Sequence, residues 1–221
     1  MIDIRKLRGE LEIGMGFKHI IFIIVFFIGC APKPVGVQMP QPELATQPGI
    51  AFFPGSIPDG CVVPFEWIPP YTDHNWRMIV VHHSASDKGG AKIFHEWHQG
   101  RGWDELGYHF VIGNGTDTQD GYVEVGSRWL KQKRGAHTKS PDDSFNEYGI
   151  GICVVGNFEN CKPTLVQMNS LRCLLAFLMA RYNMNVDQLY CHREVKGNDT
   201  LCPGKNFPMA ELQDWAKCSR E

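Results

Sequence analysis

The sequence lacks the excess of positive charge that a polyanionic partner would require. Its formal net charge is -2 over 221 residues, and no stretch of lysine and arginine is long enough to follow a phosphate backbone. Two short basic clusters, around Arg5 and at 131–134, are expected to be solvated surface, because charged side chains rarely become buried. The sequence therefore predicts no nucleic-acid partner.

The sequence also lacks an apolar run long enough to cross a bilayer as a helix, which needs about 20 residues. The run Ile20 to Ile28 (IIFIIVFFI) is much shorter and follows several lysines and arginines. That combination is typical of the apolar part of an export signal rather than of a spanning helix. We therefore expect an exported protein.

The apolar run ends in Phe27-Ile28-Gly29-Cys30, which resembles the cleavage site of bacterial lipoproteins. The resemblance implies a signal peptide over 1–29 and a lipid on Cys30, although Phe27 departs from the leucine preferred there. An uncleaved anchor, or a secretory signal with a chance cysteine, remains the alternative. Ala31 is not the aspartate that retains such proteins at the inner membrane. The expected location is the cell envelope, anchored by lipid, and the outer membrane facing the periplasm if the source has two membranes.

Proline is dense in the next segment, residues 30–70. Proline fixes φ and removes a hydrogen-bond donor, so this segment is neither a helix nor a central strand. We predict a semi-extended tether that rises about 3.1 Å per residue where it is polyproline-like. Alternatively, the apolar part of this segment, Ile50 to Phe65, packs on the domain. The domain itself is expected to span residues 71–221.

No internal repeat is visible, and strand and helix signals alternate from Trp76 onward. Thr164 and Gln167 form a capping box at the start of a helix with a regular apolar face. The pattern predicts an α/β fold with a single mixed sheet and helices packed on it. Strands are expected at 78–82, 108–112, 121–125, 148–155 and 189–191, and helices at 91–98 and from 164.

Histidine is unusually frequent from His74 onward, where eight of the nine histidines lie. Zinc prefers histidine and cysteine ligands, and a catalytic zinc site keeps three of them plus a water. The best local pair is His192 and Cys202, but its spacing is not a compact metal motif. Cys202 could instead form a disulfide in an oxidising compartment.

Five short blocks occur in one order between Trp76 and Leu212, and together they resemble the zinc N-acetylmuramoyl-L-alanine amidases. That family includes phage lysozyme-type amidases and peptidoglycan recognition proteins. The resemblance implies a zinc site at the edge of the sheet in a surface groove. The blocks are IVVHHSA (79–85), GYHF (107–110), GAH (135–137), GIGI (149–152), and HRE (192–194) with TLCPG (200–204).

Carried over residue by residue, the resemblance implies that His82, His192 and Cys202 hold Zn²⁺. Tyr108 and Thr200 match the two catalytic positions, although phage relatives carry lysine where this chain has Thr200. Neighbours in a strand point to opposite faces, so the residues alone do not choose between His82 and the next histidine. The family pattern makes that choice.

The walls of the groove are less well defined by the sequence. His137 resembles a family position beside the substrate groove, and a structural role in a loop is its alternative. Trp97, Trp103 and Trp129 are candidates for contact with sugar or peptide, and Trp103 is the favoured one. Aromatic residues are more often part of the core.

The implied reaction is hydrolysis of the amide bond between N-acetylmuramic acid and L-alanine in peptidoglycan. The matched blocks contain no pair of carboxylates, which glycoside cleavage normally needs. The alternative is a lipoprotein that binds peptidoglycan without cutting it, as recognition proteins without the zinc cysteine do. The expected partners are peptidoglycan or muropeptides and, through the lipid, a membrane. The expected state is a monomer.

Six further cysteines allow 15 disulfide pairings, which the sequence does not resolve. Cys153 lies in an apolar strand and is expected to be a free buried thiol. A link between Cys61 and Cys218 would join the two ends of the domain and is the pairing we consider here. The six are Cys61, Cys153, Cys161, Cys173, Cys191 and Cys218.

Overall fold

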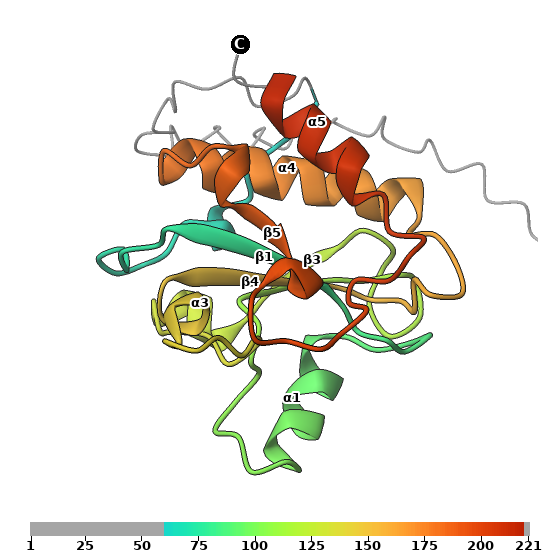
Figure 1. Ribbon diagram of the computed structural model, residues 1–221, viewed down its shortest axis with the longest axis horizontal. Coiled ribbons are helices and arrows are strands. Elements are labelled where there is room, and N and C mark those ends of the chain that lie inside the picture. The colour runs from blue at the N-terminus through green and yellow to red at the C-terminus, as the bar shows by residue number, and fades with distance from the viewer. Residues whose placement is uncertain (1–59, 219–221) are drawn as a thin grey trace, which may run out of the picture. The chain divides into compact units, whose positions relative to one another are not determined.

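The computed structural model describes residues 60–218. The expected signal peptide, Cys30 and most of the proline-rich segment lie outside these residues. A five-stranded sheet forms the centre of the domain, and helices lie on both of its faces (Figure 1). The predicted α/β class with a single mixed sheet is therefore confirmed. Within the described range, none of the helices is both long enough and apolar enough to cross a membrane.

The sheet has the order β3-β2-β4-β1-β5. Strand β1 lies between β4 and β5 and is parallel to both, while only the β2–β3 pair is antiparallel. Every predicted strand forms, but β2 begins two residues later than expected, so Tyr108 and His109 lie just before it. The strands are β1 (Met78–His83), β2 (Phe110–Ile112), β3 (Val123–Val125), β4 (Gly149–Val154) and β5 (Leu189–Cys191).

Both predicted helices are present. The capping box of α4 is complete: the Gln167 N–H donates to Thr164 Oγ1 at 2.9 Å, and the Thr164 N–H donates to Gln167 Oε1 at 3.1 Å. Helix α5 was not predicted, although its buried residues recur at helical spacing. The α-helices are α1 (Ala91–Gln99), α2 (Ser127–Leu130), α3 (Ser144–Glu147), α4 (Leu165–Arg181) and α5 (Met209–Cys218). Three 3₁₀ turns are η1 (Phe65–Trp67), η2 (Val186–Gln188) and η3 (His192–Glu194).

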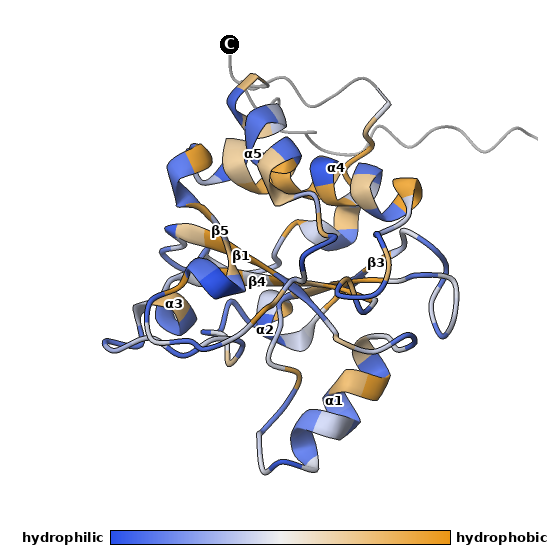
Figure 2. Ribbon diagram, turned by 45° about the vertical axis from the view of Figure 1, so that its right-hand side comes forward, coloured by the Kyte–Doolittle hydropathy of each residue, from blue (hydrophilic) through white to orange (hydrophobic). Residues whose placement is uncertain are grey.

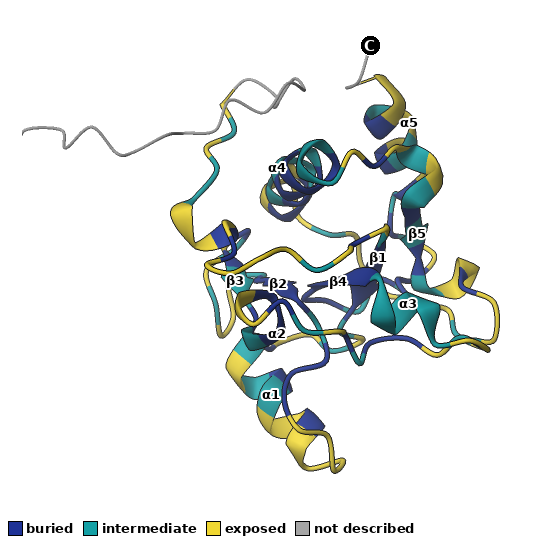
Figure 3. Cartoon of the chain, turned by 90° about the vertical axis from the view of Figure 1, so that its left-hand side faces the viewer, coloured by how far each residue is buried: buried dark blue, intermediate teal, exposed yellow. Residues whose placement is uncertain are grey.

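The larger core lies between the sheet and helices α4 and α5, which cover one face (Figures 1 and 2). Side chains of a strand alternate between its two faces, so β1 and β4 send every second residue into this core. The side of α4 that faces the sheet is buried (Figure 3). Residues that meet there include Ile79, Val81, Ile150, Ile152, Leu171, Leu174, Leu175, Leu178 and Leu212.

The opposite face of the sheet carries a smaller apolar cluster that involves α1. Phe94 of α1 meets Val111 of β2 and Cys153 of β4 in this cluster. Cys153 is a buried free thiol, as predicted. The alternation of β1 places His82 on this face as well, directly across from Cys153 in the parallel register.

The segment before β1 belongs to the folded domain from Cys61 onward. Cys61 forms a disulfide with Cys173 of α4, so the pairing of Cys61 with Cys218 considered above is wrong, and Cys218 is a free, exposed thiol. Trp67 is buried, and its carbonyl accepts a hydrogen bond from Trp129 Nε1 at 2.9 Å. Cys61 and Trp67, which precede the expected boundary at 71, thus make contacts within the folded domain, while most of the stretch from Ile50 to Phe65 lies outside the described residues and its packing stays a prediction.

Candidate metal centre

Three candidate ligands meet at the carboxyl ends of β1 and β5. His82 is the fifth residue of β1, and His192 begins η3 directly after β5. Cys202 lies in the loop between η3 and α5 and is buried. Loops that follow parallel strands gather at one edge of a sheet, which is where open α/β sheets bind ligands. This topology brings residues 120 positions apart into one cluster.

The potential ligand atoms of His82, His192 and Cys202 all lie within 4.8 Å of one another. Cys202 Sγ is 3.9 Å from His82 Nδ1, and the two imidazole centroids are 4.5 Å apart. The backbone N–H of His83 donates to Cys202 Sγ at 3.3 Å. One sulfur and two ring nitrogens form a donor set typical of a zinc site that keeps a fourth position open.

His83 points to the opposite face of the sheet from His82. Its Nδ1 accepts a hydrogen bond from the backbone N–H of Phe158 at 3.2 Å, which holds the ring away from the cluster. This arrangement follows from strand geometry, because adjacent side chains alternate. The structure therefore places His82, the histidine that the family pattern selects, in the cluster, and it places His83 outside the cluster.

Burial controls the charge state of His82 and Cys202. It lowers the pKa of His82 well below the usual value, helped by the nearby His137 and His192, so the ring is neutral and can act as a ligand. Burial also raises the pKa of Cys202 to about 12. A thiol with that pKa stays protonated near neutrality unless a cation binds it, and metal ligation is what converts such a thiol to a thiolate. These features fit a divalent ion with soft ligands.

The two predicted catalytic residues lie beside this cluster. The Tyr108 ring centroid is 5.2 Å from that of His82. Burial, with the neighbouring thiols of Cys153 and Cys202, raises the pKa of Tyr108 well above its usual value, so its hydroxyl stays protonated. Thr200 Oγ1 accepts a hydrogen bond from the Cys202 N–H at 3.2 Å. Both hydroxyl-bearing side chains are thus positioned next to the candidate ligands.

The comparisons with known proteins agree with this geometry. A family model described as N-acetylmuramoyl-L-alanine amidase matches residues 72–205, well over half of the chain. The chain belongs to this amidase family. The match includes the candidate ligands and both residues beside them.

The similarity to relatives of known sequence or structure extends over most of the length of each relative. The endolysin of Enterobacteria phage T3 is 37% identical over 147 residues, which is 63% of this chain and 84% of the endolysin. The solved endolysin amidase LysCS from Clostridium intestinale is 34% identical with a TM-score of 0.55, covering 64% of this chain and 84% of LysCS. Bumblebee PGRP-SA, at 21% identity and a TM-score of 0.52 over 69% of this chain and 92% of its own, shares the fold.

His137 lies behind the candidate ligands of the amidase domain. It is 7% exposed, and both ring nitrogens have partners: Nδ1 is 3.0 Å from His82 Nε2, and Nε2 is 3.2 Å from the carbonyl oxygen of Gly149. Burial lowers the pKa of His137 to about 4, so the ring is neutral near pH 7. The substrate contact expected from the sequence stays a prediction, and contact with His82 is what the structure shows.

The three tryptophans considered as groove walls occupy different environments. Trp103 is 39% exposed and packs on His98 with ring centroids 4.5 Å apart; His98 in turn lies 5.6 Å from Tyr108. Trp103 therefore remains a candidate wall of the amidase site. Trp97 is half-exposed on α1, beside Phe94. Trp129 is wholly buried in the core against Phe110, so its assignment as a possible groove wall is wrong.

The basic cluster at 131–134 forms ion pairs rather than a free positive patch. Lys131 and Lys133 contact Glu105, Lys133 also contacts Asp104, and Arg134 contacts Asp143. These pairs are partly exposed, as expected from the sequence. The neutralised charges give no support to a polyanionic partner.

Asn198 is a polar residue at the candidate metal centre that the sequence did not reveal. Its Oδ1 is 3.1 Å from His192 Nε2 and accepts from the Lys139 N–H at 3.2 Å. Its Nδ2 donates to the carbonyl oxygens of Lys139 at 2.6 Å and Val195 at 3.0 Å. Asn198 lies in the short loop between His192 and Cys202, and this position is the feature of the sequence that could have indicated a role beside the ligands.

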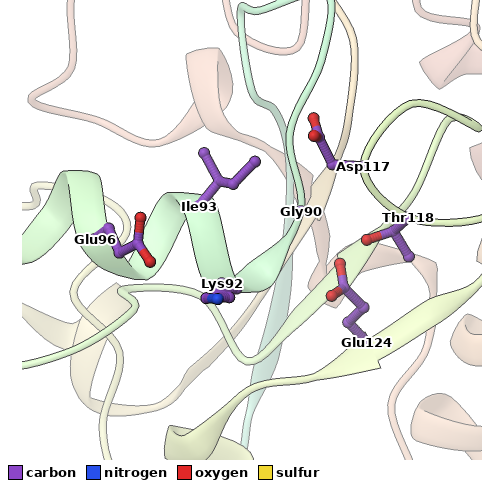
Figure 4. Close-up of a pocket in the computed structure, with 7 residues that line it drawn as sticks. All are labelled: Gly90, Lys92, Ile93, Glu96, Asp117, Thr118 and Glu124. Carbon is purple, nitrogen blue, oxygen red and sulfur yellow. The ribbon is translucent and has the colours of Figure 1, made fainter.

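A separate surface hollow of about 320 Å³ lies between the start of α1 and strand β3 (Figure 4). Its lining includes Glu96, Asp117 and Glu124, and none of the predicted site residues. Glu124 accepts a hydrogen bond from the Ala91 N–H at 2.8 Å and thereby caps α1. This carboxylate has a structural role, and the hollow is separate from the candidate metal centre.

Proposed function

We propose that this protein is a zinc-dependent amidase that hydrolyses the bond between N-acetylmuramic acid and L-alanine in peptidoglycan. The convergence of His82, His192 and Cys202 within 4.8 Å carries this proposal. Membership of the amidase family supports the choice of bond. The thiol Cys202 supports the enzymatic reading over a recognition protein that only binds, because it completes the set of three ligands.

A zinc ion held by these three residues would lower the pKa of a bound water toward about 7 and so supply a nucleophile near neutral pH. The protonated hydroxyl of Tyr108 can donate a hydrogen bond to the oxygen on which negative charge develops when the amide carbonyl is attacked. Thr200 can help to orient the attacking water. Cleavage of the C–N bond then releases the amine of L-alanine, which takes up a proton.

The products of digestion test this proposal. Purified protein incubated with peptidoglycan should release peptides that begin with a free L-alanine and should leave the glycan strands intact, as read by mass spectrometry. The His82→Ala variant is the matched control and should release nothing. New reducing sugar ends, or cuts within the stem peptide, would contradict the assignment. Binding without any release in the zinc-loaded protein would favour the recognition alternative.

We also propose that the protein is exported and anchored at the cell envelope through a lipid on Cys30. The apolar run before this cysteine supports export, as does the Cys61–Cys173 disulfide, because disulfides persist mainly in oxidising compartments. The Cys30→Ser variant should leave the membrane fraction and lose labelling by a fatty-acid analogue. Cys161→Ser, which changes an exposed thiol of the domain, should stay anchored. Equal fractionation of parent and Cys30→Ser would refute the lipid anchor.

A further inference from the structure

We propose that His137 and Asn198 are positioning residues that hold His82 and His192 in the tautomer whose Nδ1 faces the metal position. This inference rests on the proposed zinc site and adds to it the groups that orient two of its ligands. It concerns side chains on four segments: His137 in the loop before α3, His82 in β1, His192 in η3 and Asn198 in the loop after η3. The hydrogen-bond network determines where each ring proton lies.

The direction of the first chain of hydrogen bonds is fixed at Gly149. A backbone carbonyl can only accept, so His137 must carry its proton on Nε2, which lies 3.2 Å from the Gly149 oxygen. The neutral His137 ring then has a lone pair on Nδ1, 3.0 Å from His82 Nε2. His82 must therefore donate from Nε2, and its Nδ1 keeps the lone pair. That nitrogen is the one 3.9 Å from Cys202 Sγ.

The second chain gives the same result for His192. Asn198 Nδ2 faces the carbonyl oxygens of Lys139 and Val195, which identifies it as the donor end of the amide. The Oδ1 of Asn198 must then accept from His192 Nε2 at 3.1 Å. His192 consequently also presents a lone pair on Nδ1. Two unrelated hydrogen-bond partners thus select the same ligand atom in both histidines.

The sheet leaves space for His137. A Cβ placed on Gly151 of β4 would lie 2.4 Å from a carbon of the His137 ring, and one placed on Gly135 would lie equally close. Both positions therefore require glycine for the ring to reach its place beside His82. A histidine buried in this way and engaged at both nitrogens is held in one orientation. Such outer partners typically change metal affinity by 10–100-fold when they are removed.

Two measurements test the inference on the full chain. The first is long-range proton–nitrogen NMR of the metal-free protein, which distinguishes the two tautomers of each ring. We expect His82 and His192 to be protonated on Nε2. Protonation of His82 on Nδ1 would overturn the proposal, and this measurement needs no variant.

The second measurement is zinc affinity, determined by competition with a chromogenic chelator. His137→Phe and Asn198→Ala should each bind zinc about 10–100-fold more weakly than the parent. His109→Phe is the matched control: His109 is also buried and donates or accepts at both nitrogens, with the Lys133 carbonyl and the Gly151 N–H as partners. Within residues 60–218 no hydrogen bond joins His109 to a candidate ligand, so its variant should keep the parental affinity within about threefold.

The outcomes separate this inference from the proposed function. A parent that binds no zinc would refute the zinc amidase, while the tautomers measured by NMR would still decide the inference. A parent that binds zinc with an affinity equal to that of His137→Phe would refute the inference alone. If the substitution at His137 prevents folding, the NMR result and the Asn198→Ala affinity decide it.

Discussion

Strand β1 contributes Ile79 and Val81 to the face of the sheet that α4 and α5 cover, whereas it contributes His82 to the other face. Strand β4 repeats the contrast, with Ile152 on the first face and Cys153 on the second. The first face is closed by aliphatic and aromatic packing and gains stability from burial. The second face buries imidazoles and thiols, which costs desolvation free energy that hydrogen bonds must offset.

The contrast shows how the alternation of side chains along one strand places residues that stabilise the fold on one face and residues that could bind a metal on the other. Because one face is densely packed, the sheet is rigid enough to hold side chains on the other face in fixed positions. Substitutions on the two faces should therefore have different consequences. Those on the α4 face should change the free energy of unfolding, and those on the α1 face should change metal binding and turnover.

The largest effect is expected at Cys202. Cys202→Ala removes one of three candidate ligands, so zinc content should fall to near zero and amidase activity should fall by at least about 10³-fold, more than the loss of one oxyanion donor. Metal analysis and mass spectrometry of the digest measure the two quantities. Cys161→Ala makes the same change at an exposed free thiol and should alter neither. Full activity of Cys202→Ala after chelation would show that the proposed site is not the catalytic one.

A smaller effect on the same face is expected at Tyr108. Tyr108→Phe keeps the ring beside His82 but removes the hydroxyl donor, so kcat should fall about 10²–10³-fold while zinc remains bound. Tyr122→Phe is the control, because Tyr122 is half-exposed and its hydroxyl faces Glu66 at 3.4 Å. Unchanged kcat in Tyr108→Phe would remove Tyr108 from the mechanism.

The apolar face was largely predictable from the sequence, because its signals are local. The spacing of leucines in α4, the capping box at Thr164 and the short apolar strands each depend on neighbours in the chain. Helix α5 also carried such a signal in Met209, Leu212 and Ala216 and was overlooked. The attachment of Cys61 to the domain depends on a disulfide with Cys173 of α4, which lies 112 residues away and which periodicity does not report.

The candidate site was predictable only through the family pattern. Physical reasoning on the residues found His192 and Cys202 but did not choose between His82 and His83, because that choice depends on which face of the strand meets α4. The buried contact of His137 with His82 and the role of Asn198 both arise from tertiary hydrogen bonds. The disulfide partner of Cys61 was likewise missed, since sequence spacing does not encode distance in space.

A modest effect on stability alone is expected at Ile152. Ile152→Val deletes one buried methyl group from the α4 face, which should lower the free energy of unfolding by about 0.5–1.5 kcal/mol, measured by denaturant unfolding. Zinc affinity and kcat should match the parent. Leu165→Ala, at a side chain that is 81% exposed, should change stability by less than about 0.5 kcal/mol. A loss of turnover in Ile152→Val would show that the two faces are not independent.

The smallest effect is expected at Glu105, in the loop before Tyr108, and it concerns the dependence of the free energy of unfolding on pH. Glu105 accepts from the Ser127 hydroxyl and pairs with Lys131 and Lys133. Burial alone would raise the pKa of Glu105, but these partners lower it to about 2. A carboxylate whose pKa is lower in the folded state contributes stability above its unfolded pKa of about 4.3, and this contribution disappears as the pH falls toward 2. Lys131 is exposed and Lys133 is half-exposed, so solvent screens both pairs and we expect the contribution to be at most about 1 kcal/mol.

Glu105→Gln tests this contribution in the loop before Tyr108. Its free energy of unfolding should lie below that of the parent at pH 7, and the two values should converge between about pH 4.3 and pH 2 as the parental carboxylate becomes protonated. Lys131→Met removes one partner and should give a curve between the two. The buried histidines titrate in both proteins, so the difference between the curves isolates Glu105. Parallel curves for parent and Glu105→Gln down to pH 2 would mean that protonation of this carboxylate does not change the free energy of unfolding.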